Sequence, residues 1–232
     1  MRILFKTNYK QDLNLAKHGG HRFWYGLLIL VLFAAPLILG GYYIGEATRI
    51  LIYAMAGLGL MVLTGFTGQV SLGHAAFLAI GAYTNAWFLA QGFSSFVALP
   101  MAALLSMIGG LLVAIPAARM SGIYLAIATL AFAIIVEDFA GHLNSITGGN
   151  RGMMVDVPTL FGYQIWESWE LYLFVLSILV AATLAVLNIL RSPLGRAMIA
   201  VRDSEVSSQA LGVNPMKIKV FAFTMSAAIT GL

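Results

Sequence analysis

The chain has 232 residues, of which 60% are hydrophobic and 9% are charged, and its mean hydropathy is +0.90. Soluble domains carry about a quarter charged residues, so this composition excludes a water-soluble globular protein. The lack of cysteine excludes disulfides and thiolate metal sites, and the net charge of +4 is better read as a topology signal than as a nucleic-acid-binding surface. The composition predicts an all-α integral membrane protein, a polytopic helix bundle with no nucleic-acid partner.

The N-terminal segment is basic and is followed by an apolar run, as in a secretory signal peptide. No small-residue cleavage site follows, and residues 23–45 are long enough to cross a bilayer, so we interpret them as a retained first helix. Residues 1–22 are then expected to form an N-terminal tail, and residues 23–232 a transmembrane domain.

The remaining apolar segments predict several further spans. A bilayer core of about 30 Å requires about 20 apolar residues per helix, and residues 50–118 contain no Asp, Glu, Lys or Arg. Residues 220–232 are apolar but too short to cross, so we expect six complete spans, a truncated seventh, and a chain that is incomplete at its C-terminus. The predicted complete spans are residues 23–45, 50–66, 71–91, 94–118, 120–140 and 171–190.

Positive charge predicts the orientation. With six spans before residue 191, the N-terminus and the polar stretch 191–219 lie on the same side of the membrane. Of the 13 Lys and Arg residues, only Arg49 and Arg151 fall on the opposite side. The positive-inside rule therefore predicts a cytoplasmic N-terminus, an external loop at 141–170 and a cytoplasmic loop at 191–219.

A polar, glycine-containing segment, residues 63–76, lies at predicted membrane depth. Loose backbone and polar side chains are tolerated there when they are buried in protein or line a wet cavity. A broken helix of this kind can present backbone N–H groups to a carboxylate or zwitterion. The alternative is helix packing, in which small residues allow close approach and polar side chains bond across the contact. The candidates for lining a substrate path are Gln69, Ser71 and His74.

A second segment, residues 145–152, lies in the predicted external loop. Its glycines permit the positive φ angles of a tight turn. The functional interpretations are a lip of a translocation path or a docking surface for an external partner. The alternative is an ordinary external turn, and the residues alone favour this alternative. The candidates are Thr147, Gly148, Gly149 and Gly152.

The cytoplasmic stretch predicts one amphipathic helix. Ser192 followed by Pro193 is typical of an N-cap and first turn, and Gly212 is placed to end the helix. Such a helix either inserts into a groove of a soluble partner or lies on the anionic leaflet, and its acidic residues favour a protein partner. Its apolar face is expected to include Met198 and Leu211. The candidate contact residues are Arg196, Val201, Arg202, Glu205 and Gly212.

Several catalytic motifs are missing from the sequence. There is no phosphate-binding G-x-x-x-x-G-K-[ST] loop, no H-E-x-x-H and no G-x-S-x-G. We therefore expect no catalytic residue, no metal site and no cofactor in this chain. If the chain belongs to an energised transporter, a separate motor subunit must supply the energy, because this sequence has no nucleotide-binding loop of its own.

As a set, six motifs resemble the permease family of branched-chain amino acid ABC transporters, in particular the LivM-type subunit. They cover residues 53–232 in order and rough spacing. The motifs are residues 64–77, 122–132, 147–152, 192–197, 200–205 and 210–212.

The resemblance implies an importer in a bacterial inner membrane, built from two permease subunits, two cytoplasmic ATPases and a periplasmic substrate-binding protein. ATP would be bound by the partner subunits, and residues 196–212 would be the coupling helix that contacts them. Substrates in the family are branched-chain amino acids, with relatives that carry other amino acids, urea or short amides. The alternatives from other classes are an ATP-independent secondary carrier or channel and a structural subunit of a larger membrane complex.

Overall fold

The computed structural model describes residues 19–120, 122–155, 157–160 and 162–232. Helices make up most of this part of the chain, and its only strands are two short ones that pair antiparallel, with Thr159 opposite Gln164. The elements are α2 (Gly19–Ile38), α3 (Gly41–Leu60), the π-helical turn η1 (Met61–Gly65), α4 (His74–Ala90), α5 (Ser95–Ala117), α6 (Ile123–His142), α7 (Asn144–Thr147), the 3₁₀ turn η2 (Gly149–Arg151), β1 (Thr159–Leu160), β2 (Tyr163–Gln164), α8 (Ser168–Arg191), α9 (Pro193–Asp203), α10 (Glu205–Ala210) and α11 (Pro215–Thr230).

Within the described residues, four helices are long and apolar enough to cross a membrane. They are α3 continued through η1 (Gly41–Gly65), α5, α6 and α8, and α2 contains a shorter apolar stretch, Phe23–Ile38. Large apolar side chains such as Leu112 (68% exposed) and Ile123 (69% exposed) lie on their outer faces. Contiguous apolar surface of this kind belongs in lipid or against another subunit. The predicted all-α polytopic membrane bundle is confirmed, while the count of six spans and a partial seventh stays a prediction.

The first predicted helix boundary was wrong. Residues 23–45 were expected to form one span, but α2 ends at Ile38 and α3 begins at Gly41 after an extended Gly40. Two adjacent glycines are poor helix formers, which explains the break. Residues 46–49, which were expected to lie between two spans, belong to α3. There Arg49 and Glu46 lie one turn apart and form an ion pair of 3.3 Å. The residues of the predicted tail that are described, 19–22, belong to α2, and residues 1–18 lie outside the described part.

The last helix begins earlier than expected, at Pro215 instead of residue 220. The side chain of Asn214 caps it by accepting a hydrogen bond from the backbone N–H of Lys217 (3.2 Å). Proline suits the first helical turn, where its missing N–H costs no hydrogen bond. Lys217 and Lys219, which were expected to belong to the loop 191–219, therefore lie on α11.

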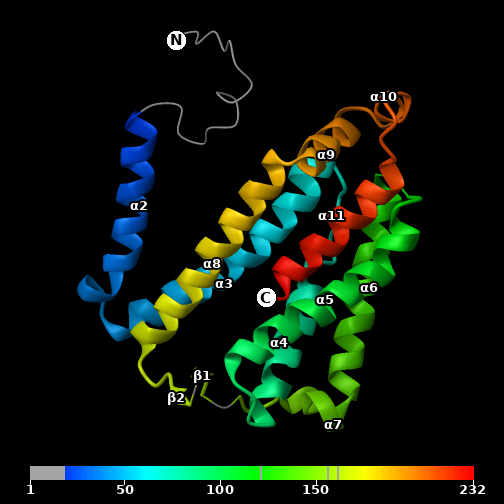
Figure 1. The fold of residues 1–232 in the computed structure, drawn as a ribbon. Helices are drawn as coiled ribbons and strands as arrows, with labels where there is room; N and C mark the ends of the chain where they lie inside the picture. The colour runs from blue at the N-terminus through cyan, green and yellow to red at the C-terminus, as the bar shows by residue number, and fades with distance from the viewer. Residues whose placement is uncertain (1–18, 121, 156, 161) are drawn as a thin grey trace.

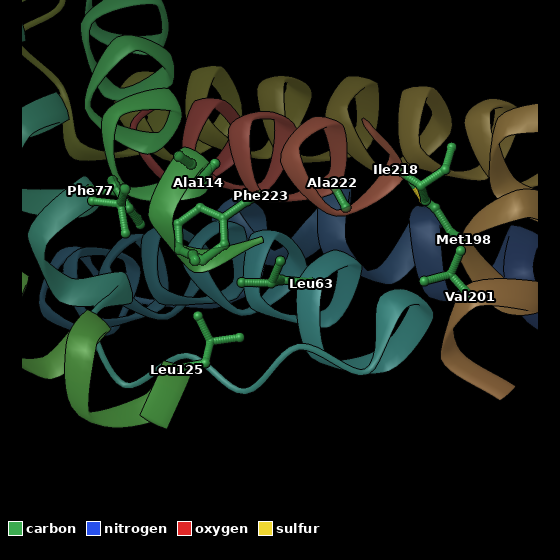
Figure 2. Close-up of a cluster of buried hydrophobic side chains, with 12 residues drawn as sticks. Leu63, Phe77, Ala114, Leu125, Met198, Val201, Ile218, Ala222 and Phe223 are labelled. Carbon is green, nitrogen blue, oxygen red and sulfur yellow. The ribbon is translucent and has the colours of Figure 1, made fainter. Parts of the chain in front are cut away.

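Helix α11 is the centre of the bundle and packs against α3, α4 and α5. Glycines on its neighbours allow this close approach: a Cβ on Gly59 would lie 2.7 Å from the carbonyl oxygen of Ser226, and one on Gly110 would collide with the methyl group of Ala227. Figure 2 shows Phe223 and Ala222 of α11 in the main apolar cluster, with Phe77, Leu63 and Met198 around them.

The polar loops lie at opposite ends of the bundle. In Figure 1, α9, α10 and the start of α2 are at one end, and α7, β1 and β2 are at the other. This arrangement separates two of the three segments in which the sequence places candidate functional residues, 145–152 and 191–219.

Candidate functional site

The polar segment between η1 and α4 is a helix break held by its own side chains. Thr67 Oγ1 donates to the carbonyl oxygen of Leu63 (2.6 Å), and the backbone N–H of Gln69 reaches the same oxygen (3.2 Å). Gly68 has φ +69°, which favours glycine, and a Cβ there would lie 2.9 Å from Cγ of Arg202. The break is therefore shaped by local hydrogen bonds and by the close passage of α9.

Gln69 connects the break to α11. Its side chain is buried, and Nε2 donates to the backbone carbonyl of Lys219 (3.2 Å) and to Thr67 Oγ1 (3.1 Å). Its Oε1 is buried without a hydrogen-bond partner. A buried polar atom left unpaired is costly, so this oxygen is a natural place for a water or for another group to bind.

Ser71 and His74 make a second connection to α11. His74 Nε2 lies 2.7 Å from Ser226 Oγ, and His74 Nδ1 lies 2.9 Å from Ser71 Oγ. Ser226 donates its only hydroxyl proton to the carbonyl oxygen of Gly59 (2.5 Å). The neutral imidazole therefore carries its proton on Nε2 and accepts at Nδ1 from Ser71.

The structure brings Gln69, Ser71 and His74 to one place, the contact of the break with α11. All three are buried there, and none of them lines the three cavities described below. The sequence left two interpretations open, a substrate path and helix packing. The bonds from Gln69 and His74 to α11 are contacts of the kind that helix packing predicts. Sequence reasoning missed Ser226, the partner of His74 on α11, although a serine within the apolar segment 220–232 was a visible signal.

Residues 192–212 form two helices, so the single helix predicted over this stretch was wrong. The chain is extended at Ser204 (φ −162°), whose side chain caps α10 by accepting from the backbone N–H of Ser207 (3.2 Å). Pro193 starts α9 as predicted, but the Ser192 hydroxyl donates back to Ile189 O (2.6 Å) instead of capping the helix. Gly212 (φ +83°) follows the end of α10, as expected.

Helix α9 contributes buried apolar side chains, whereas the apolar side chains of α10 and the residue after it are exposed. Met198 and Val201 of α9 lie in the main apolar cluster, whereas Leu211, expected on the same face, is 82% exposed. Val206 of α10 is 79% exposed. Because α10 turns away from the axis of α9, its apolar side chains point out of the bundle.

Charged residues tie this segment to the rest of the protein. Arg202 Nη1 donates to the carbonyl oxygen of Gly65 (2.8 Å), and Glu205 Oε1 pairs with the buried Nζ of Lys219 (2.5 Å). Arg196 lies on the exposed side and donates to the carbonyl oxygen of Arg191 (3.3 Å). The sequence predicted Arg202 and Glu205 as contact residues but gave no sign that their partners are Gly65 and Lys219.

The loop between α6 and α8 has the tight turn that its glycines permit. Gly148, Gly149 and Gly152 all have positive φ angles, of 73°, 60° and 72°. Thr147 Oγ1 lies 2.6 Å from the carbonyl oxygen of Ala140 and accepts from the backbone N–H of Gly149 (3.1 Å). Thr147 thereby fastens the turn to the end of α6.

A cavity of about 530 Å³ lies between α4, α6 and this turn, with Gly149 and Gly152 in its lining. Glu137 and Arg151 also line it, and Arg151 borders a neighbouring polar cavity of about 550 Å³. A smaller, partly open and mainly apolar cavity of about 250 Å³ is lined by α3, α4, α5, α8 and the end of α11. Among the described residues, no group of three or more His, Cys, Asp or Glu side chains is placed to hold a metal ion.

Comparisons with known proteins agree with the motifs. The profile of a family described as the permease component of branched-chain amino acid transport systems matches residues 42–232. The chain is 36% identical over 229 residues to the high-affinity branched-chain amino acid transport system permease protein LivM of Salmonella typhimurium, which covers 88% of this chain and 54% of that protein. It is 36% identical over 234 residues to the protein of the same name from Escherichia coli (90% and 55% covered).

A third relative is more distant. It is the probable branched-chain amino acid transport permease protein LivM of Methanocaldococcus jannaschii, with 26% identity over 133 residues, which covers 57% of this chain and 39% of that protein. No solved structure matches the chain. The chain spans about half the length of the two LivM proteins at 36% identity. It belongs to the family of permease components of branched-chain amino acid transport systems.

Proposed function

We propose that this chain forms a membrane-spanning permease subunit of an ATP-binding-cassette importer that moves branched-chain or other small amino acids across a bacterial inner membrane. The observation that carries the proposal is a pair of connections: Glu205 joins α10 to Lys219 of α11, and Arg202 joins α9 to Gly65 at the start of the helix break. A partner that moves α9 and α10 would therefore move α11 and the start of α4 as well. The chain performs no chemical step, and ATP is hydrolysed on a separate subunit.

The topology that we propose has the N-terminus, residues 1–22, in the cytoplasm, with α2 and α4 as further spans and α11 as part of a seventh. The arrangement of loops at the two ends of the bundle supports this topology (Figure 1). It places loop 191–219 in the cytoplasm and loop 141–170 outside, in agreement with the positions of the positive residues.

The partners that we propose follow from the exposed surfaces. Val206 and Leu211 present apolar side chains on α10, and we propose that they enter a groove of a cytoplasmic ATPase. Arg196 and Gly212 flank this surface, and Val201 anchors it to the core. The exposed apolar faces of α5 and α6 fit lipid and a second permease subunit, and the turn at Thr147–Gly152 fits a periplasmic substrate-binding protein.

The substrate path, in this proposal, runs beside the helix break. Gln69, Ser71 and His74 hold the start of α4 against α11, so a change in their contacts would open or close the space between these helices. The unpaired Oε1 of Gln69 supports a position next to a wet path.

Co-purification tests the proposal. The full-length chain should retain its candidate ATPase in mild detergent, and Val206→Asp or Leu211→Asp should lose it. Met154→Asp is the matched control, because Met154 is 97% exposed but lies in the external loop. If Met154→Asp releases the ATPase as completely as the α10 variants, the assignment of α10 is wrong. Retention of no ATPase, together with uptake that proceeds without ATP, would instead show a secondary carrier or channel.

A further inference from the structure

We propose that the cavity between α4, α6 and the glycine turn is a binding site for a zwitterionic amino acid with an aliphatic side chain. Arg151 binds the α-carboxylate, Glu137 binds the α-ammonium group, and the alanine-rich wall holds the side chain. This inference rests on the proposed function, because it names the substrate class and the external site of the same importer.

The size and lining of the cavity fit such a ligand. Its volume of about 530 Å³ lies within the range of about 300–1,000 Å³ for small-molecule sites. Ala79 of α4 and Ala133 and Val136 of α6 form apolar walls. Because these side chains are short, they leave the space between the two helices open.

The charges fit the two ends of a zwitterion. Glu137 and Arg151 line the same cavity but come from different elements, α6 and η2. In the described part of the chain, the ion pairs involve other residues, so neither Glu137 nor Arg151 is paired there. Each charge is therefore free to meet an opposite charge on a ligand.

The backbone around Arg151 leaves room for a ligand. Gly149 and Gly152, which flank it, also line the cavity, and a Cβ on Gly152 would meet no atom within 4 Å. The guanidinium offers a fork of N–H donors that matches a carboxylate. The adjoining cavity of about 550 Å³ shares Arg151 and lies on the loop side, lined also by His142 and Asn144.

The same geometry argues against uncharged substrates. Urea or a short amide would leave both Glu137 and Arg151 without an opposite charge, and a site built to pair with charged groups rejects analogues that lack them. An aliphatic acid would satisfy only Arg151, and an amino acid amide would satisfy only Glu137. The site therefore predicts that both ends of the amino acid are required.

The lack of cysteine in the sequence allows a direct test by single-cysteine labelling. Ala79→Cys or Ala133→Cys would be introduced into the full-length chain in its complex in lipid nanodiscs, and the rate of reaction with a small thiol reagent measured. Leucine should slow the reaction about fivefold or more, whereas leucinamide and 4-methylpentanoate should slow it less than twofold. Val155→Cys, at an exposed position of the same loop outside the cavity lining, should be unaffected.

A second substitution in the single-cysteine variant tests whether Arg151 and Glu137 bind the ligand. With Arg151→Gln or Glu137→Gln added to Ala79→Cys, protection by leucine should be lost, and the pair Arg49→Gln and Glu46→Gln on α3 serves as a matched control. Equal protection by leucine and both analogues, no protection at all, or protection that survives both cavity variants would overturn the proposal. Protection by the periplasmic binding protein alone would show a docking surface and would also overturn it. Because labelling needs no ATP, a failure here leaves the importer assignment to be judged by ATP-dependent uptake and co-purification.

Discussion

Arg202 of α9 donates from Nη1 to the carbonyl oxygen of Gly65 at 2.8 Å, so α9 is bonded to the π-helical turn that follows α3. Its Cβ and Cγ also lie against Gly68, the positive-φ residue of the break. One side chain thus connects the surface that we assign to the ATPase with the start of the segment that leads to α4.

Replacement of Arg202 by Ala should weaken the coupling between ATP hydrolysis and transport. A charge-assisted hydrogen bond contributes about 1.5–3 kcal/mol, and we expect about 1 kcal/mol here because the side chain is 44% exposed. Leucine uptake per ATP hydrolysed should fall roughly fivefold in proteoliposomes, since about 1.4 kcal/mol corresponds to a factor of ten. Arg202→Lys, which keeps one donor, should be intermediate. If Arg202→Ala releases the ATPase altogether, Arg202 is a docking residue and not a coupling residue.

Removal of one partner of the Glu205–Lys219 pair should destabilise the protein. The Lys219 side chain is only 8% exposed, so Glu205→Gln leaves a buried ammonium group without its carboxylate. Loss of one partner of a buried pair costs about 3–5 kcal/mol, and we expect roughly half of this because Glu205 is 49% exposed. The Tm in detergent should fall for Glu205→Gln and recover in Glu205→Gln/Lys219→Met. A Tm of Glu205→Gln equal to that of the unmodified chain would show that the pair contributes nothing.

Residues with local structural causes were predicted well. Gly148 and Gly149 were expected to permit the positive φ angles of a tight turn, and both angles are positive. The break around Gln69 was expected from glycines and polar residues at membrane depth. These features depend on a few neighbouring residues, so a single sequence contains them.

Contacts between distant segments were not predicted. His74 and Ser226 are 152 positions apart, and Arg202 and Gly65 are 137 positions apart. Such pairs depend on how α11 and α9 pack in the bundle, which helix periodicity does not determine. The break at Ser204 could have been found, because a serine directly before an acidic residue is a helix-start signal.

The β1–β2 hairpin makes a pH-dependent contact with the start of α8. Tyr163 donates to Glu170 Oε1 (2.7 Å), and this hydrogen bond, with the negative charge of Glu170, raises the pKa of Tyr163 above its ordinary value of 10.0. A raised pKa favours the neutral phenol, so the contact contributes fully below pH 10 and is lost as the pH rises through the raised pKa. Ultraviolet titration, compared with Tyr163→Phe to isolate this residue, should show it ionising late.

Glu170→Gln removes the charge that raises this pKa. Tyr163 should then ionise nearer to its ordinary pKa of 10.0. Glu46→Gln, which changes a carboxylate on α3, should leave the titration of Tyr163 unchanged. A Tyr163 titration that is the same in Glu170→Gln as in the unmodified chain would contradict the contact.

Gly57 and Gly59 of α3 allow the effect of helix packing on stability to be measured apart from the effect of helix propensity. A Cβ on Gly59 would lie 2.7 Å from the carbonyl oxygen of Ser226 and would collide with Thr230 Oγ1, whereas one on Gly57 would meet nothing within 4 Å. Gly57→Ala should therefore stabilise the protein by about 0.5–1 kcal/mol, because alanine is the better helix former. Gly59→Ala should destabilise it by about 1–3 kcal/mol, because α11 must move away from α3 and the hydrogen bond from Ser226 to the Gly59 carbonyl is strained.

Thermal unfolding of the two variants in the same detergent measures this difference. The change from Gly to Ala is identical in both and the positions are two residues apart on one helix, so their difference reports the contact with α11 alone. If Gly59→Ala melts at or above the temperature of Gly57→Ala, α11 does not pack against this face of α3. The placement of His74 against Ser226 would then fail as well, because Ser226 donates to the Gly59 carbonyl and bonds to His74 through the same hydroxyl group.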